Sequence, residues 1–131
     1  MPFTLHTLTN GRYATHLMPA GTGYSTWDGL ALTRWKADPV TDGDCFVVYL
    51  RDRQRGAMWS LGRQPVATPG AQRASRFSAE CAELRCVQDG ISAELTVVVP
   101  AAAAVELRRV TLRNHGDRPR QIELTSYAEV V

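Results

Sequence analysis

Residues 82–99 read AELRCVQDGISAELTVVV, in which two runs of alternating apolar and polar residues flank Asp89-Gly90. An Asp-Gly pair between such runs is typical of a two-residue type I′ turn, because both turn residues must take positive φ. This turn pairs the residues on either side of it, and the register then follows along both strands, with Leu84 opposite Leu95. The apolar side chains gather on one face, so the stretch predicts an antiparallel sheet with one buried face.

The same register sorts the polar residues and two cysteines of this hairpin. Arg85 falls directly opposite Glu94 on the polar face, where a cross-strand ion pair adds a little stability. Cys81 and Cys86 differ in parity, so on a regular strand they point to opposite faces and cannot form a disulfide. We expect Cys86 to be buried and both residues to be free thiols.

The rest of the chain repeats this pattern of short strands. No part of it has a sustained helical apolar period, and short runs rich in Val, Leu, Thr, Tyr and Trp recur between Gly, Pro, Asp and Asn. The sequence therefore predicts an all-β fold, an antiparallel β-sandwich, formed as a single domain over residues 1–131. The expected strands are Phe3–Leu8, Arg12–Met18, Leu30–Trp35, Cys45–Leu50, Ala57–Leu61, Arg76–Gln88, Ile91–Val99, Val105–Arg113 and Gln121–Val130. Asn10-Gly11 and Arg51–Gly56 are expected to be hairpin turns.

The last two expected strands are predicted to pair as a hairpin. Val105 and Leu107 differ in parity from Val110 and Leu112, so a one-residue bulge near Arg108-Arg109 is expected to keep all four on the core side. The sequence is still strand-like at its last residue, which predicts an N-terminal fragment of a larger module. An open strand edge of this kind recruits partners, so a homodimer is expected.

Composition excludes several classes of protein. The 131 residues carry 15 basic and 13 acidic side chains, and the basic residues are scattered among the acidic ones, so no nucleic-acid-binding surface is predicted. No apolar run approaches the length of a membrane span, and no signal peptide is present at the start, which favours a cytoplasmic location for this segment. The cysteines and histidines lack metal-ligand spacing, and an odd number of cysteines argues against a disulfide framework. These residues are Cys45, Cys81, Cys86, His6, His16 and His115.

The segment Ala20–Trp35, AGTGYSTWDGLALTRW, is the candidate functional site. Its three glycines permit a tight loop, which is expected to present Tyr24, Ser25, Trp27 and Asp28 to solvent. Aromatic rings beside hydroxyl, carboxylate and guanidinium groups are the chemistry of a sugar-contacting surface. The alternative is that the tryptophans belong to the core. The candidate substrate-binding residues are Gly23, Tyr24, Ser25, Trp27, Asp28, Arg34 and Trp35.

A series of short motifs carries a resemblance to a known family. The motifs are LTNGRY at 8–13, GTGYS at 21–25, LTRW at 32–35, YLRD at 49–52, WS at 59–60 and IELTSYAE at 122–129. In this order they resemble the N-terminal β-sandwich of the cellobiose and chitobiose phosphorylase family, most closely the phosphorylase-like part of cyclic β-1,2-glucan synthases. The likeness covers nearly the whole chain.

The resemblance implies a galactose-mutarotase-like supersandwich, of which this chain is a partial one, followed in the parent by a catalytic (α/α) barrel. The barrel carries the catalytic carboxylate for inverting phosphorolysis, so no catalytic residue and no cofactor are expected in this chain, and inorganic phosphate belongs to the parent enzyme. Gly23, Tyr24 and Ser25 match the family's glycine-rich loop and are expected to line or close the glucan or oligosaccharide site. The parent is expected to be anchored to the bacterial inner membrane.

Two other functions fit the same fold. In a free-standing carbohydrate-binding module, Tyr24, Trp27 and Trp35 would form a platform that holds glucan without chemistry. In a structural docking domain, none of these residues would contact sugar. Catalysis by the chain's own acids is not expected, because Asp28, Asp52 and Asp89 each sit in a turn where backbone capping accounts for them.

Overall fold

The computed structural model describes residues 5–34, 46–63, 65–66 and 68–131, and every regular element among them is a β-strand. The strands are β1 (His6–Thr9), β2 (Tyr13–Leu17), β3 (Gly23–Trp27), β4 (Leu30–Ala31), β5 (Val47–Asp52), β6 (Met58–Ser60), β7 (Gln72–Phe77), β8 (Ala82–Gln88), β9 (Ile91–Val98), β10 (Leu107–Asn114) and β11 (Ile122–Tyr127). The predicted all-β fold is confirmed. The expected residues Trp35 and Cys45 lie outside the described ranges.

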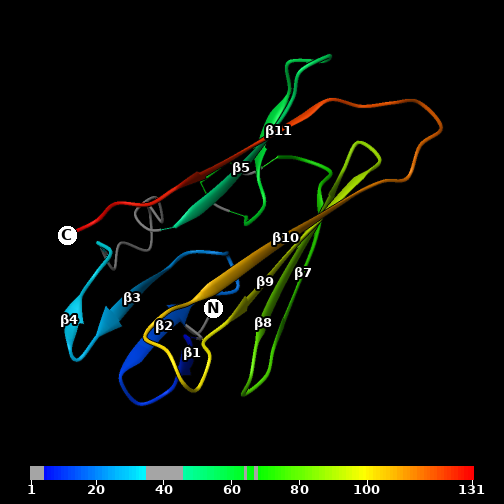
Figure 1. Cartoon of the computed structure of the whole chain (residues 1–131). Coiled ribbons are helices and arrows are strands. Elements are labelled where there is room, and N and C mark those ends of the chain that lie inside the picture. The colour runs from blue at the N-terminus through cyan, green and yellow to red at the C-terminus, as the bar shows by residue number, and fades with distance from the viewer. Residues whose placement is uncertain (1–4, 35–45, 64, 67) are drawn as a thin grey trace.

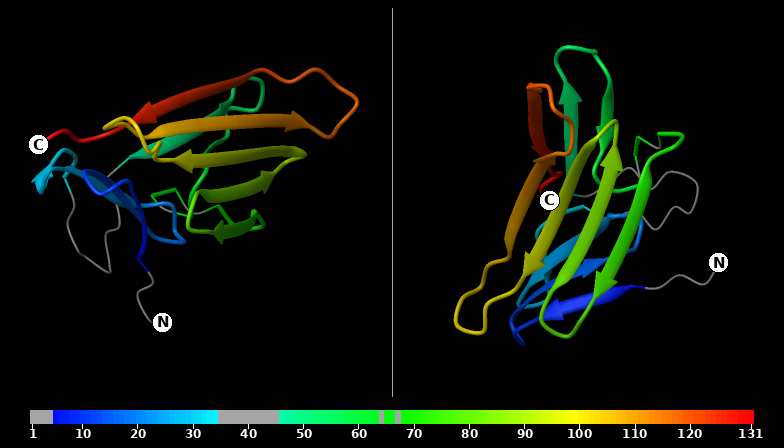
Figure 2. Two further views of the ribbon diagram at one scale, coloured as in Figure 1. Left: turned by 60° about the horizontal axis from the view of Figure 1, so that its bottom comes forward. Right: turned by 90° about the vertical axis from the view of Figure 1, so that its right-hand side faces the viewer.

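The strands form three antiparallel sheets, in the orders β1-β2-β3-β4, β10-β9-β8-β7 and β11-β5-β6 (Figure 1). The other two sheets cover one face of the β10-β9-β8-β7 sheet, β1–β3 over one half and β5, β6 and β11 over the other (Figure 2). A bridge between Thr33 and Val130 joins the two covering sheets at their margin. The result is a two-layered sandwich whose second layer is split.

The core lies between these layers. Leu8 and Leu17 come from the β1–β4 sheet, Leu50 and Trp59 from the β5–β6 hairpin, and all four are at most 2% exposed. They pack against the inward face of β8 and β9, which consists of Ala82, Leu84, Cys86, Ile91, Ala93, Leu95 and Val97. The apolar face that the sequence predicts for this hairpin is therefore the floor of the core.

The β8–β9 hairpin has the predicted register throughout. Leu84 pairs with Leu95 and Arg85 with Glu94, and the turn residues Asp89 and Gly90 have φ values of 48° and 77°. Positive φ at both positions is the conformation that a type I′ turn requires. The two cysteines also agree with prediction, since Cys86 is buried, Cys81 is half-buried and both are free thiols.

Two predicted elements in the first two-thirds of the chain are wrong. The segment at 23–27, expected to be a loop, is strand β3, and it pairs with β2 from Tyr13 to Leu17. The expected single strand Arg76–Gln88 is two strands, β7 and β8, joined by a turn at residues 78–81. Ser78 makes this turn without glycine or proline, because its hydroxyl accepts a hydrogen bond from the Cys81 N–H at 3.1 Å.

Two predictions about the C-terminal strands are also wrong. β10 pairs with β9 from Leu107 to Asn114 without the expected bulge. Without the bulge, Arg108 takes the inward position, and its guanidinium lies 4.1 Å from the centre of the Phe46 ring. Leu107, the preceding residue on the strand, therefore faces outward and is 55% exposed. β11 pairs with β5 instead of β10, so the last two strands belong to different sheets.

A buried ion pair between Asp52 and Arg120 directs β11 to β5. Asp52, at the end of β5, is 1% exposed, and its carboxylate accepts hydrogen bonds from the Nε of Arg120 at 3.2 Å and from the backbone N–H groups of Gln54 and Arg55. The Nη1 of Arg120 donates to the carbonyl of Asp89 at 2.7 Å. One guanidinium thus connects the turns of the β5–β6 and β8–β9 hairpins. The Arg120 hydrogen bond holds the pKa of Asp52 below its usual value.

The first prediction compares two aspartates that each pair with an arginine. Asp52→Asn is expected to lower the melting temperature at pH 7, because it removes the charge that Arg120 neutralises in a buried site. Since the folded-state pKa of Asp52 is lowered, its contribution is complete above the unfolded pKa of about 4 and is lost as the pH falls through the folded value. The difference between wild type and variant should therefore shrink in acid.

Asp28→Asn is the matched control. Asp28 pairs with Arg12 at 2.9 Å, but its side chain is 41% exposed and that of Arg12 is 70% exposed. Exposed pairs of this kind contribute little. Thermal unfolding followed by circular dichroism between pH 3 and 8 measures both variants, and equal losses in the two would contradict the structural role given to Asp52.

Candidate functional site

Strand β3 carries most of the predicted site residues. Its first residue, Gly23, is buried, and a Cβ atom placed on it would lie 1.8 Å from the carbonyl oxygen of His16 on β2. No side chain fits there. Gly23 is therefore required by the close approach of two backbones inside the sheet, which accounts for this glycine without a ligand.

Tyr24 lies on the outer face of the β1–β4 sheet. Its ring stacks on that of His16, with centroids 4.4 Å apart and an interplanar angle of 26°. The Nδ1 of His16 is 2.8 Å from the hydroxyl of Thr7 on β1. Burial lowers the pKa of His16, so the imidazole is neutral at pH 7. Thr7, His16 and Tyr24 are aligned on three adjacent strands, and we call them the outer row.

Ser25 points the other way. It is 2% exposed, so the expectation that it faces solvent is wrong. Its hydroxyl lies 3.2 Å from the Thr15 hydroxyl and donates to the carboxylate of Glu106 at 3.0 Å. The Nη2 of Arg108 donates to the same carboxylate at 3.3 Å. The side chain of Arg108 is only 10% exposed and that of Glu106 only 15%. These residues form a buried polar cluster that connects β3 with the start of β10.

Sequence reasoning missed Glu106 and Arg108. They are 81 and 83 residues from Ser25, and no local pattern indicates that contact. One signal was available. Arg108 has the inward parity of Val110 on β10, and a cation at an inward position requires a buried carboxylate beside it.

Trp27 and Asp28 lie at the tip of the β3–β4 hairpin. Trp27 is 38% exposed and pairs with Leu30, which is 63% exposed. Asp28 and Gly29 form the turn with φ values of 46° and 78°. The carboxylate of Asp28 accepts two hydrogen bonds from Arg12, at 2.9 and 3.2 Å, and these lower its pKa.

The predicted site residues are not brought together at one place. Tyr24 and Trp27 are three positions apart on one strand, so they point to opposite faces and cannot form a single platform. Arg34 lies near the C-terminus, where its Nε is 3.7 Å from Glu129 and its N–H donates to the Glu129 carbonyl. Trp35 lies outside the described residues. The outer row, the buried cluster and the hairpin tip are thus three separate environments.

Metal and membrane features can be checked over the same part of the chain. Within residues 5–34, 46–63, 65–66 and 68–131, no three His, Cys, Asp or Glu side chains are grouped as metal ligands would be. None of these segments forms a helix with the length and apolar character of a membrane span.

A family model describing the glycosyl hydrolase 94 supersandwich domain matches residues 3–131. The chain belongs to this family. The match confirms the resemblance drawn from the short motifs, and it agrees with the three antiparallel sheets of the structure. These residues are therefore a supersandwich domain of the glycosyl hydrolase 94 type, and the motif residues on β3 are part of that fold.

Named relatives of the supersandwich domain act on glycans. A cyclic beta-(1,2)-glucan synthase, NdvB of Rhizobium meliloti (strain 1021), is 39% identical over 124 residues, which is 95% of this chain and 4% of that protein. An N,N'-diacetylchitobiose phosphorylase of Vibrio proteolyticus is 29% identical over 123 residues, 90% of this chain and 15% of the phosphorylase. A 3-O-beta-D-glucopyranosyl-beta-D-glucuronide phosphorylase of Paenibacillus borealis is 36% identical over 76 residues, 58% of this chain and 10% of that enzyme. The chain spans a small part of each relative.

The second prediction concerns the glycine of the GYS motif. Gly23→Ala is expected to destabilise the domain by about 1–3 kcal/mol or more, because the added methyl group collides with the backbone of β2. Gly116→Ala is the control, since its Cβ would meet only the Asn114 side chain at 3.4 Å. Chemical denaturation measures both. A Gly23→Ala variant as stable as wild type but weaker in glycan binding would show that the glycine serves a ligand.

Proposed function

We propose that this supersandwich domain is a non-catalytic part of a glycan phosphorylase or cyclic β-glucan synthase. In this proposal the 131 residues belong to a larger carbohydrate-active module, and they shape a glucan or oligosaccharide site that a separate (α/α) barrel completes. The observation that carries the proposal is the outer row. It combines an aromatic stack with a threonine hydroxyl on a rigid sheet face, which suits the C–H face and the hydroxyl groups of a sugar.

Asp28 and Asp52, two of the three acids considered for catalysis, support a non-catalytic role. Inverting glycoside chemistry uses two carboxyl groups, one of which must keep its proton near neutral pH to act as a general acid. The pKa values of Asp28 and Asp52 are both lowered by arginine, which is the opposite direction. The carboxylate of Glu106 is buried against Ser25 and Arg108. In the proposal, catalysis and inorganic phosphate therefore belong to the barrel.

The location of the parent protein is part of the same proposal. We place this segment in the cytoplasm of a parent anchored to the bacterial inner membrane. Support for a reducing compartment comes from the cysteine content, since an odd number of cysteines, three, argues against a disulfide framework.

The third prediction tests the outer row in the parent enzyme. Tyr24→Ala is expected to raise the KM for the glycan about 2- to 12-fold, which corresponds to about 0.5–1.5 kcal/mol for one aromatic contact. Tyr127→Ala, a change of the same kind on β11, is expected to leave KM unchanged. If both variants match wild type, the outer row does not contact glycan.

Titration of the isolated chain with glucan, followed by tryptophan fluorescence, separates the alternatives. We expect little or no saturable binding, because the proposed site is incomplete without the barrel. Saturable binding that Trp27→Ala abolishes would instead favour a free-standing module that uses the exposed hairpin tip. If Tyr24→Ala and Trp27→Ala change glycan binding neither in the isolated chain nor in the parent enzyme, a structural docking domain is favoured.

The fourth prediction concerns self-association. β11 is the outer strand of its sheet, no other described strand pairs with its free edge, and Leu124 on it is 41% exposed. Such an edge accepts a further strand. We therefore expect the isolated chain to form a two-fold dimer through β11, with a molar mass by light scattering that rises with concentration.

A charge placed on this edge tests the contact. Leu124→Lys is expected to shift the chain to the monomer, because a lysine on an edge strand opposes pairing. Leu112→Lys on β10 is the matched control, since Leu112 is 40% exposed. A chain that remains monomeric at hundreds of micromolar, or a dimer that only the control disrupts, would contradict the use of β11.

A further inference from the structure

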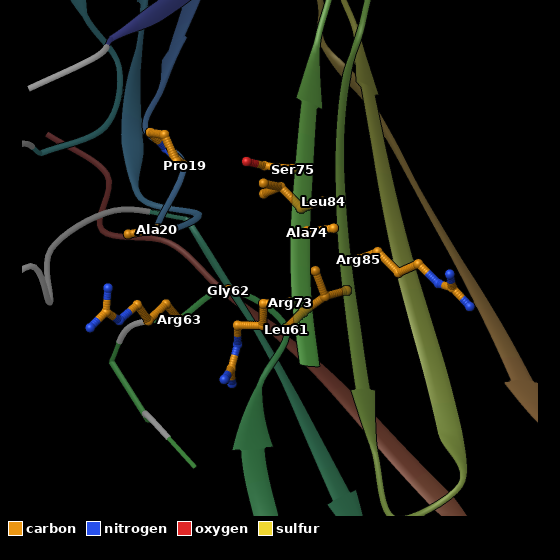
Figure 3. A pocket seen from close by; sticks show the side chains of 10 residues that line it. All are labelled: Pro19, Ala20, Leu61, Gly62, Arg63, Arg73, Ala74, Ser75, Leu84 and Arg85. Atoms are coloured by element: carbon orange, nitrogen blue, oxygen red, sulfur yellow. The ribbon is translucent and has the colours of Figure 1, made fainter. Parts of the chain in front are cut away.

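A pocket lies beside β7, the strand at one edge of the β10-β9-β8-β7 sheet (Figure 3). Its volume is about 280 Å³, and it is open to solvent and lined by the turn between β2 and β3, the segment after β6 and strands β7 and β8. A second cavity of about 480 Å³ shares Arg63 and Arg73 with it and reaches Thr68. None of these residues belongs to the outer row or to the buried cluster.

Two glycines bring the backbone walls of this pocket into contact. A Cβ on Gly21 would lie 2.8 Å from the Cα of Gly62, and a Cβ on Gly62 would lie 2.5 Å from the Ala20 carbonyl oxygen. Across the gap, Ser75 and Leu84 point from the sheet toward Pro19 and Ala20 (Figure 3). The pocket is therefore built from closely packed backbone on one side and a sheet face on the other.

Arginine dominates the polar groups at one end of the pocket. Arg73 is held in place because its Nη2 donates to the Ser60 carbonyl at 3.1 Å. Its Nε–H is buried and makes no hydrogen bond to any residue that the structure describes, which is costly for a charged group. Arg63 lies at the same end with an exposed guanidinium, whereas the Arg85 guanidinium extends away from the pocket (Figure 3).

The described residues that line these two cavities include no carboxylate. The acids Glu83 and Glu94 line a different hollow, which also contains Arg85. The hydroxyl that lines the second cavity together with both arginines is that of Thr68, which donates hydrogen bonds as readily as it accepts them. Ser75 lies at the other end of the first pocket, beside Pro19 (Figure 3). Two cations and a hydroxyl without a carboxylate among the described lining residues form an environment that favours an anion.

We propose that the end of this pocket that continues into the second cavity is an oxyanion-binding site, with Arg73 and Arg63 as the charged ligands and Thr68 as a hydroxyl donor. Guanidinium groups match the geometry of phosphate and carboxylate oxygens and form charge-assisted hydrogen bonds with them. The unpaired Nε–H of Arg73 supplies a donor that the fold itself does not use. The ligand class is a phosphate group or the carboxylate of an acidic sugar, bound at a place separate from the outer row.

The test uses the 131-residue chain with inorganic phosphate as the probe, against sodium chloride at the same ionic strength. Binding to the folded state raises the melting temperature with concentration, and the Thr68 amide signal in NMR spectra should shift saturably. Arg63→Ala is expected to weaken phosphate affinity about tenfold or more, since a charge-assisted contact is worth about 1.5–3 kcal/mol. Arg53→Ala, an exposed arginine of the β5–β6 turn, is the matched control and should behave as wild type.

Arg73→Ala should abolish the shift. If that variant does not fold, Arg63→Ala and Arg73→Lys keep the test decisive, because lysine retains the charge but lacks the Nε–H and the planar fork. Tyr24→Ala should leave phosphate binding unchanged, which separates this site from the proposed glycan contact. The two proposals can therefore fail independently. Loss of the glycan predictions would not contradict the anion site, and absence of anion binding would not contradict the glycan contact.

Further probes identify the source of the oxyanion. A stronger response to phosphate than to glucuronate assigns the site to phosphate groups, and the opposite order assigns it to acidic sugars. Either result supports the proposal. It is overturned if neither anion acts beyond ionic strength, if neutral glucose acts equally well, or if Arg63→Ala and Arg53→Ala lose affinity to the same extent.

Discussion

The buried pair of Asp52 and Arg120 is the interaction on which the arrangement of the sheets depends. Asp52 accepts hydrogen bonds from its own hairpin turn and from Arg120, while Arg120 also binds the Asp89 carbonyl in the turn of the β8–β9 hairpin. Removing one member of such a pair leaves an uncompensated charge in a site with 1% exposure. The pair therefore sets the spacing of the two layers at one end and starts β11 alongside β5.

A second polar contact fixes the other end of the sandwich. The buried cluster joins Ser25 on β3 to Glu106 and Arg108 at the start of β10, and the Phe46 ring covers the guanidinium. The inner face of β3 is held in this way, and its outer face carries Tyr24 stacked on His16. In the proposed function this stack favours glycan binding, because side chains that are already positioned cost less to order when a ligand binds.

The sequence predicts the features that depend on local chemistry. Asp89-Gly90 determines its own turn, so every pair of the β8–β9 hairpin and the burial of Cys86 could be derived by counting. β3 could not, because its glycine, serine and polar neighbours are those of a loop, and it becomes a strand through pairing with β2. The partner of β11 is determined by Arg120 and Asp52, 68 residues apart, and the environment of Ser25 by Glu106, 81 residues away. Contacts of this range leave no local pattern.

The GTGYS motif can now be divided by what each residue does. Gly21 and Gly23 are required where backbones meet, Ser25 closes a buried hydrogen-bond network, and Thr22 is 1% exposed. Three of the five residues, the two glycines and Ser25, are thus explained by folding, so a match to this motif in a relative indicates the supersandwich fold and carries little information about the ligand. Tyr24 alone presents its side chain on the outer face of the sheet. The proposed glycan contact therefore rests on Tyr24 and on the residues beside it on β1 and β2, where substitution alters the surface without disturbing the core.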